Sequence, residues 1–217
     1  MKGDLILVID LDGTLISDET AKKIYREAYI ETLKIMRKKG IKIPEEFSSH
    51  SFENYRELAK RYEEFKRIYE TIYPKVMKKY IDDVRGEEGR ARSIYYYLVS
   101  QYNPKSVYIL TANPKGDVII SEILPEIPRK NIIVSDSIDY IESKKKALES
   151  LKNLGKVLYI ADRDDIDRPA AEKAGVYYRN VETIIVELKE KEKELYETKI
   201  FFPPQTKFKS EFEYNNL

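Results

Sequence analysis

The chain has 217 residues, and its 39 Lys and Arg side chains nearly cancel its 38 Asp and Glu side chains. Such a balance produces no overall field to attract nucleic acid or an anionic membrane, so neither is expected as a partner. The sequence has no cysteine, which excludes disulfides, thiolate nucleophiles and zinc–thiolate sites. Charged residues make up 35% of the chain and tryptophan is absent, a usage that resembles that of heat-adapted proteins.

The apolar stretch near the start of the chain is too short, and too interrupted by aspartate, to be a signal peptide or a membrane span. We therefore expect a cytoplasmic protein, either a monomer or a homodimer. A chain of this length can bury one large core, as a single domain or as a domain that carries an insertion.

The first apolar run, over residues 5–9, stops at Asp10 and is followed by Asp12 and a Gly-Thr pair. This pattern is typical of a buried strand whose carboxyl end opens into a loop. Two carboxylates so close together repel each other unless a cation lies between them or one of them keeps its proton. The opening of the chain therefore predicts a functional site at the end of the first strand.

From residue 18 to about residue 100, apolar residues recur every three or four positions, which predicts helices only. The first helix, over 21–36, is expected to end at Gly40. A second apolar stripe over 52–72 predicts one helix that Pro74 breaks or kinks, and Val76, Met77 and Tyr80 resume the helical pattern.

Two glycines, Gly86 and Gly89, are expected to interrupt the helical pattern before a further helix that ends at the turn formed by Asn103 and Pro104. Beyond this turn, short apolar runs alternate with helical segments, which is typical of a parallel sheet with helices on both faces. The fold class expected is therefore α/β. The predicted strands cover residues 5–9, 107–110, 132–134, 157–160 and 176–178.

Polar residues follow two more of these strands directly. One strand leads into Thr111, Ala112 and Asn113, and another leads into an acidic run that begins at Asp162. In an open parallel sheet, ligands bind beyond the carboxyl ends of the strands, where the winding direction switches. Each feature alone also occurs as a turn, a helix cap or a solvated acid, but their combination favours one shared site.

The order of these features resembles the four motifs of the haloacid dehalogenase superfamily, whose members are mostly magnesium-dependent phosphatases. The matching segments are DLDGTL, Thr111, a lysine in ESKKKAL, and ADRDDIDRPAAEKAGV. Ala161 stands where the family often has glycine. The resemblance implies a discontinuous Rossmann-like core over 1–17 and 104–200, with an all-helical cap over 18–103 inserted between the first two motifs. Residues 201–217 are expected to form an extended arm on this molecule or on a second copy.

The resemblance implies a small phosphorylated metabolite as substrate, Mg²⁺ as cofactor, and hydrolysis through an aspartyl-phosphate on Asp10. Asp12 would protonate the leaving alcohol and then deprotonate water. The carboxylates of Asp10 and Asp162 and the backbone carbonyl of Asp12 would hold the ion, steadied by Asp167. The residues implied to bind the transferring phosphate are Thr111, Ala112, Asn113 and Lys144.

Some of these assignments have rivals. Lys144 is preferred over its neighbours Lys145 and Lys146 because it leaves the apolar positions of its helix facing the core. Asp165 is the alternative to Asp167 beside the metal, whereas Asp164 is expected to be solvated. The single histidine, His50, lies in a polar stretch and is expected to occupy a surface loop without a catalytic role.

Other functions stay open at this stage. A phosphomutase uses the same aspartyl-phosphate but returns the phosphate to a bound sugar phosphate. A dehalogenase is less expected, because displacing a halide does not need the acid at Asp12. A binding module without activity would lose the nucleophile or a metal acid, whereas Asp10, Asp12 and Asp162 are all present.

Overall fold

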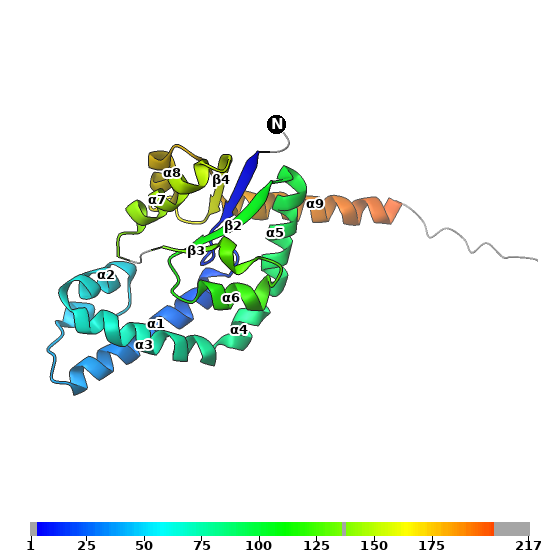
Figure 1. The fold of residues 1–217 in the computed structure, drawn as a ribbon. Coiled ribbons are helices and arrows are strands. Elements are labelled where there is room, and N and C mark those ends of the chain that lie inside the picture. Colours follow the sequence, from blue (N-terminus) through cyan, green and yellow to red (C-terminus); the bar gives the residue numbers. More distant parts are fainter. Residues whose placement is uncertain (1–3, 136–137, 202–217) are drawn as a thin grey trace, which may run out of the picture.

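Five strands form one parallel sheet in the order β3-β2-β1-β4-β5 in the computed structural model, which describes residues 4–135 and 138–201 (Figure 1). This confirms the predicted parallel sheet and places every strand within two residues of its expected bounds. The strands are β1 (Leu5–Ile9), β2 (Ser106–Thr111), β3 (Ile132–Val134), β4 (Lys156–Ala161) and β5 (Tyr177–Asn180).

The first strand, β1, lies at the centre of the sheet. Val8 on β1 pairs with Tyr108 on one side and with Tyr159 on the other. From β1 the chain builds outwards through β2 and β3, and then returns to the other side of β1 to form β4 and β5. The winding direction therefore reverses around β1, and the carboxyl ends of β2, β1 and β4 lie next to one another, which is where α/β proteins bind ligands.

Helices cover both faces of the sheet, as predicted. Successive side chains of a strand point to opposite faces, so Ile6 and Val8 contact one apolar cluster while Leu7 and Ile9 contact another. The Ile6 face packs against α7 (Tyr140–Lys152) and α8 (Asp167–Ala174). The elements that share the cluster of the Leu7 face include α1 (Asp18–Lys38), α5 (Glu88–Tyr102), α6 (Gly116–Ile123) and α9 (Val181–Phe201).

Every regular element between β1 and β2 is a helix. The α-helices not yet introduced are α2 (Phe52–Arg61), α3 (Glu63–Lys79) and α4 (Ile81–Gly86). Helix α1 begins after Ser17, whose hydroxyl accepts a hydrogen bond from the Thr20 amide at 3.3 Å. Gly40 follows the end of this helix with a φ of +78°, as predicted for a helix terminus. Helices α1 and α3 lie side by side (Figure 1).

The prediction of one helix over 52–72 is wrong, because two helices cover this range. The chain is extended at Tyr62, which separates α2 from α3. Pro74 lies inside α3, and the helix continues to Lys79. Buried residues on both sides of the proline, Tyr73 and Val76, pack in the core beside α1. We attribute the continuation to this packing, which outweighs the lost backbone hydrogen bond.

The expected interruption at Gly86 and Gly89 is displaced to Glu87. Gly86 is the last residue of α4 and Gly89 lies in the first turn of α5, so Glu87 alone separates the two helices. The carboxylate of Glu87 accepts hydrogen bonds from the hydroxyls of Ser17 and Thr20 at the start of α1. This contact across 70 positions of sequence is one that local pattern does not reveal.

The helices between β1 and β2 share one apolar core with the sheet. Helix α5 also packs against α6 and α9, which follow it in the chain. The division into a core and a cap over 18–103 therefore stays a prediction. Phe201 is the last residue of α9, and the rest of the predicted arm lies outside the described residues. None of the described helices has both the length and the apolar character needed to cross a membrane.

Candidate active site

The loop after β1 brings Asp10, Asp12 and Gly13 to the carboxyl edge of the sheet. The carbonyl oxygen of Leu11 accepts hydrogen bonds from three successive amides, those of residues 14–16, which makes this turn tight. Gly13 has a φ of +77°, a conformation that favours glycine. A Cβ atom at this position would lie 2.3 Å from Oδ2 of Asp162. The Asp-Gly pair in the sequence therefore reflects both backbone conformation and the close approach of another acid.

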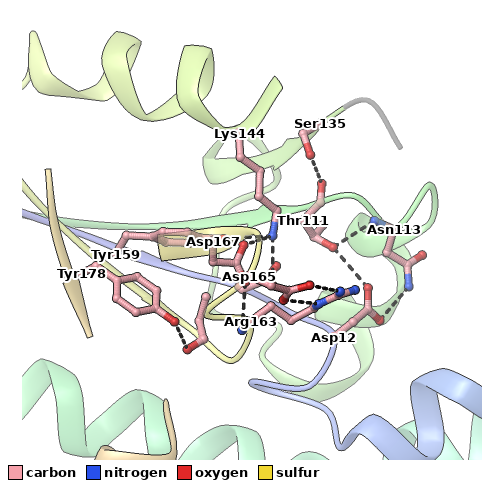
Figure 2. A network of polar contacts seen from close by, with 12 residues as sticks. Asp12, Thr111, Asn113, Ser135, Lys144, Tyr159, Arg163, Asp165, Asp167 and Tyr178 are labelled. Carbon is pink, nitrogen blue, oxygen red and sulfur yellow. Dashed lines mark hydrogen bonds and ion pairs between the residues drawn. The ribbon is translucent and has the colours of Figure 1, made fainter. Parts of the chain in front are cut away.

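A buried lysine links two acids of the site (Figure 2). Lys144, only 4% exposed, donates hydrogen bonds from Nζ to Oδ2 of Asp10 at 3.1 Å and to Oδ1 of Asp167 at 2.6 Å. It also lies 3.0 Å from the hydroxyl of Tyr159 on β4. Burial alone would lower the pKa of Lys144, but the two carboxylates raise it, so the side chain is a cation.

The structure separates the three consecutive lysines clearly. Helix α7 turns Lys144 inward on the same side as Leu148 and Leu151, which are buried. Lys145 instead pairs with Glu142 near the surface, and Lys146 is exposed. The helical period places only the first of the three against the acids.

Three carboxylates, those of Asp10, Asp162 and Asp167, offer oxygen atoms that all lie within 4.8 Å of one another. Burial raises the pKa of Asp10 well above its usual range, opposed by the cation of Lys144. Burial also raises the pKa of Asp162 to about 6. Crowded, desolvated carboxylates gain stability from a bound cation, so this group is a candidate metal site.

The donor set fits a divalent ion held mainly by Asp10 and Asp162. Oδ1 of Asp162 is buried and has no hydrogen-bond partner among the described residues. Asp167 differs, because its Oδ1 also accepts a bond from the Tyr159 hydroxyl at 2.9 Å and its Oδ2 accepts one from the Arg163 amide at 3.2 Å. A carboxylate that already accepts several hydrogen bonds within the protein suits a supporting position behind the ion. All the ligand atoms that the three carboxylates offer are oxygens, which hard cations such as Mg²⁺ prefer.

Neither rival acid reaches this cluster. Asp165 is exposed and pairs with the Arg163 guanidinium at 2.6 Å. Asp164 is also exposed, as expected, and accepts hydrogen bonds from Tyr178 at 3.0 Å and from Asn180 at 3.1 Å. The turn after β4 directs these two side chains away from Asp10, whereas Asp167 begins α8 and points inward.

Asp12 accepts hydrogen bonds from neutral donors, and Figure 2 shows two of them, Thr111 and Asn113. Its Oδ1 accepts a bond from Nδ2 of Asn113 at 3.1 Å, and its Oδ2 accepts one from the Tyr25 hydroxyl at 3.0 Å. The hydroxyl of Thr111 lies 3.5 Å from Oδ2. Burial raises the pKa of Asp12, and these donors lower it in part. The carboxyl group is thus fixed in orientation while its charged form stays disfavoured.

A cavity of about 660 Å³ lies above these residues and is bordered by the helical segment. Of the residues implied to bind phosphate, Ala112 and Lys144 line it, together with Asp10, Asp12 and Asp162. Thr111 and Asn113 lie beneath the lining, where the Thr111 hydroxyl accepts a bond from the Asn113 amide at 3.0 Å. These two residues contact Asp12 rather than open space.

The expectation that His50 occupies a surface loop is wrong in one respect. His50 does lie in a loop, but it lines the cavity, and its ring stacks parallel to that of Tyr25 at a centroid distance of 6.3 Å. It also contacts Tyr29 edge-on at 5.2 Å. Burial lowers the pKa of His50, which favours its neutral form. The polar neighbours in sequence gave no signal of these contacts, because both tyrosines come from α1.

Other lining residues escaped the sequence analysis as well. Tyr25, Tyr55 and Tyr69 line the cavity from three different helices, and Arg163 lies over the Phe52 ring at 4.8 Å. The tyrosines occupy apolar positions of helical stripes, which is also the pattern of ordinary core residues. The only available signal was the abundance of tyrosine, 18 residues in the chain.

Comparison with known proteins adds little to this picture. No protein-family model matches the sequence, and no curated protein sequence matches it. Among solved structures, the chain is similar to a hydrolase from Streptococcus pneumoniae TIGR4, with 19% identity and a TM-score of 0.37 over 82% of this chain and 92% of that one. A likeness this distant carries no argument about activity, so the function has to be argued from the site.

Proposed function

We propose that the protein is a magnesium-dependent phosphatase that hydrolyses a small phosphomonoester through an aspartyl-phosphate on Asp10. One observation carries this proposal: a buried lysine holds Asp10 from one side, while Asp12, two residues further along, lies among neutral donors beside the same cavity. One acid is thereby suited to act as a nucleophile and the other as a proton donor.

Asp10 and Asp162 would hold the ion with their carboxylates, together with the backbone carbonyl of Asp12. When bound, the ion supplies positive charge that neutralises the acids and the transferring phosphate. Asp167 would keep its bonds to Lys144 and Tyr159 and so hold both the lysine and the metal site in place.

In the first step, an Asp10 carboxylate oxygen attacks phosphorus and the ester P–O bond breaks. The departing alcohol oxygen takes a proton from Asp12, whose buried carboxyl is disposed to carry one. Lys144 stays charged beside Asp10 and stabilises the negative charge of the transferring oxygens.

In the second step, Asp12, now a carboxylate, removes a proton from water, and the resulting hydroxide attacks phosphorus. The bond between phosphorus and Asp10 breaks, which releases inorganic phosphate and restores both acids. Tyr25 and Asn113 hold the Asp12 carboxyl in one orientation throughout. If a bound sugar phosphate took the phosphate in place of water, the protein would be a phosphomutase.

The test is to trap the intermediate. The protein is incubated with an aryl phosphate and Mg²⁺, quenched in acid and digested, and phosphate is sought by mass spectrometry on the peptide that spans residues 3–22. We expect phosphate on this peptide in wild type, none in Asp10→Asn, and turnover lowered about a hundredfold or more in Asp12→Asn. Excess chelator should abolish both turnover and labelling.

Asp4→Asn is the matched control, because Asp4 is an exposed acid on the same peptide that does not line the cavity. It should behave like wild type. Phosphate still present in Asp10→Asn, or full activity in chelator, would contradict the proposed mechanism. Transfer of phosphate to an added sugar phosphate without release of inorganic phosphate would identify a mutase instead.

A further inference from the structure

One tyrosine that lines the cavity has a hydroxyl group with no role in the fold that the structure reveals. Tyr69 on α3 is only 2% exposed and lines the cavity, and its hydroxyl has no hydrogen-bond partner among the described residues. A buried polar group that lacks a partner loses its bonds to water and gains nothing in return. The described residues therefore give this hydroxyl no hydrogen bond that would stabilise the fold.

Neighbouring rings show that the surroundings tolerate either residue type. Phe65, one helical turn earlier on α3, stacks on Tyr69 at a centroid distance of 5.9 Å without any hydroxyl. Tyr29 on α1 packs on the same Phe65 at 5.7 Å, but its hydroxyl donates a hydrogen bond to the Phe47 carbonyl at 2.9 Å. Tyr69 therefore differs from both neighbours, because it has a hydroxyl that bonds to none of the described residues. Tyr73 shares this property, but only Tyr69 of the two lines the cavity.

A line of ring contacts joins Tyr69 to the proposed proton donor. Tyr69 contacts Tyr73 at 5.7 Å, Tyr73 contacts Tyr25 at 5.4 Å, and the Tyr25 hydroxyl donates to Asp12. Since Asp12 faces the leaving alcohol in the proposed mechanism, this wall of the cavity is where the alcohol part of the substrate lies. Rings of this kind pack well against C–H groups, and their hydroxyls both donate and accept hydrogen bonds.

The charges around the cavity restrict the substrate further. Burial raises the pKa of Tyr69 well above its usual range, so the hydroxyl is neutral. Four cations line the cavity among the described residues. Lys144 is buried and paired with Asp10 and Asp167, and Arg163 is half-buried and paired with Asp165. Lys22 and Arg26 are exposed. The rings around Tyr69 thus offer neutral hydrogen bonding, while the buried and half-buried cations of the lining are already paired with acids.

We infer that the Tyr69 hydroxyl recognises the alcohol part of the substrate, and that the substrate is the phosphate of a neutral polyhydroxylated alcohol, a sugar or a polyol. This inference rests on the proposed phosphatase function and adds the class of alcohol to it. One substrate hydroxyl bonds to Tyr69, and C–H groups pack against the surrounding rings. A site built to bond a hydroxyl rejects the analogue that lacks it, because the protein group is then left buried and unpaired.

The experiment compares substrates in pairs that differ by one or more hydroxyl groups. The pairs are glucose 6-phosphate with its 2-, 3- and 4-deoxy analogues, ribose 5-phosphate with 2-deoxyribose 5-phosphate, and glycerol 3-phosphate with propyl phosphate. In wild type, kcat/KM should favour the hydroxylated member of at least one pair by about tenfold or more. Tyr69→Phe should reduce that ratio to within about twofold of unity, whereas Tyr29→Phe should leave it unchanged.

Thermal unfolding separates recognition from a structural role. Tyr69→Phe should match or exceed the Tm of wild type, because it removes a hydroxyl without a partner. Tyr29→Phe should lower Tm, because it leaves the Phe47 carbonyl without its bond. A Tm that falls as far in Tyr69→Phe as in Tyr29→Phe would show that the Tyr69 hydroxyl serves the fold, and the inference would then be wrong.

Acetyl phosphate, which has no polyol part, distinguishes the two levels of the proposal. If wild type hydrolyses it with Mg²⁺ but treats every pair alike, or if Tyr69→Phe keeps the wild-type ratio, then the inference about the alcohol fails and the phosphatase function stands. If wild type hydrolyses none of the aryl phosphate, acetyl phosphate and the paired substrates, both proposals fail together.

Discussion

Replacing Asp162 by Asn tests whether this half-buried acid is built to hold a cation. Burial raises the pKa of Asp162 from its usual value of 3.8 to about 6. Each tenfold change in proton affinity corresponds to about 1.4 kcal/mol, so ionisation in the folded, metal-free protein costs up to about 3 kcal/mol. The residue is only half-buried, and water screens part of the charge. We therefore expect a cost of about 1 to 2 kcal/mol.

The pH dependence of this cost has a definite sign. Below pH 4 the carboxyl group is protonated in both the folded and the unfolded chain, so it costs nothing. As the pH rises from 4 to 6, the folded protein holds the proton more tightly than the unfolded chain does, and the free energy of unfolding falls. In chelator at pH 7.5, Asp162→Asn should therefore be more stable than wild type by about 1 to 2 kcal/mol, and the difference should vanish near pH 4.

With magnesium present, wild type should become more stable than Asp162→Asn. A ligand present at a hundred times its Kd stabilises the folded state by about 2.7 kcal/mol, and wild type should gain an amount of this order while Asp162→Asn gains little. Urea unfolding followed by circular dichroism, with Mg²⁺ or chelator, measures both effects. Asp164→Asn is the control, since this exposed acid on the same loop pairs with Arg168 and should keep the full magnesium response.

Two results would refute this reasoning. One is an Asp162→Asn protein that is less stable than wild type in chelator at pH 7.5. The other is an equal gain in stability from Mg²⁺ in the variant and in wild type, which would place the ion elsewhere.

Gly13→Ala should lower the free energy of unfolding and weaken the magnesium response, because the added Cβ would lie 2.3 Å from Oδ2 of Asp162. Gly40→Ala is the control, because Gly40 has a similar φ of +78° with open space around it. This control should show the backbone strain alone, of about 1 kcal/mol. Equal effects in urea unfolding would contradict the crowding argument. Lys144→Met should destabilise the protein by about 3 kcal/mol at pH 7, because it leaves two buried carboxylates without their cation. The loss should become smaller as the pH falls, because burial raises the pKa of Asp10 and favours its uncharged form. Lys145→Met, at a surface pair, should cost under about 1 kcal/mol, and a similar loss in both variants would refute the assignment.

Local sequence determined the strands and the acids at their ends. A short apolar run that ends at polar residues favours a buried strand that leads into a loop, and this held for β1, β2 and β4. Helical periodicity likewise identified the region between β1 and β2 as helical. The placement of Asp10, Thr111 and Asp162 at one edge follows from parallel strands alone, because the carboxyl ends of such strands meet at that edge.

Tertiary contacts decided the identity of the partners. Helical periodicity favoured Lys144 among the three lysines, but only the packing of α7 against α8 brings its Nζ to 2.6 Å from Oδ1 of Asp167. Packing against α1 carries α3 through Pro74, which overrides the local preference of proline.

The tyrosines show most clearly what the sequence alone cannot determine. At a helical position, a tyrosine of the core and a tyrosine of a binding site have the same periodicity, and the two differ only in what the hydroxyl meets. The sequence alone therefore indicated an acidic site at the end of β1. The folded chain was needed to show that Tyr25 bonds to Asp12, that His50 lines the cavity, and that the Tyr69 hydroxyl is left without a partner among the described residues.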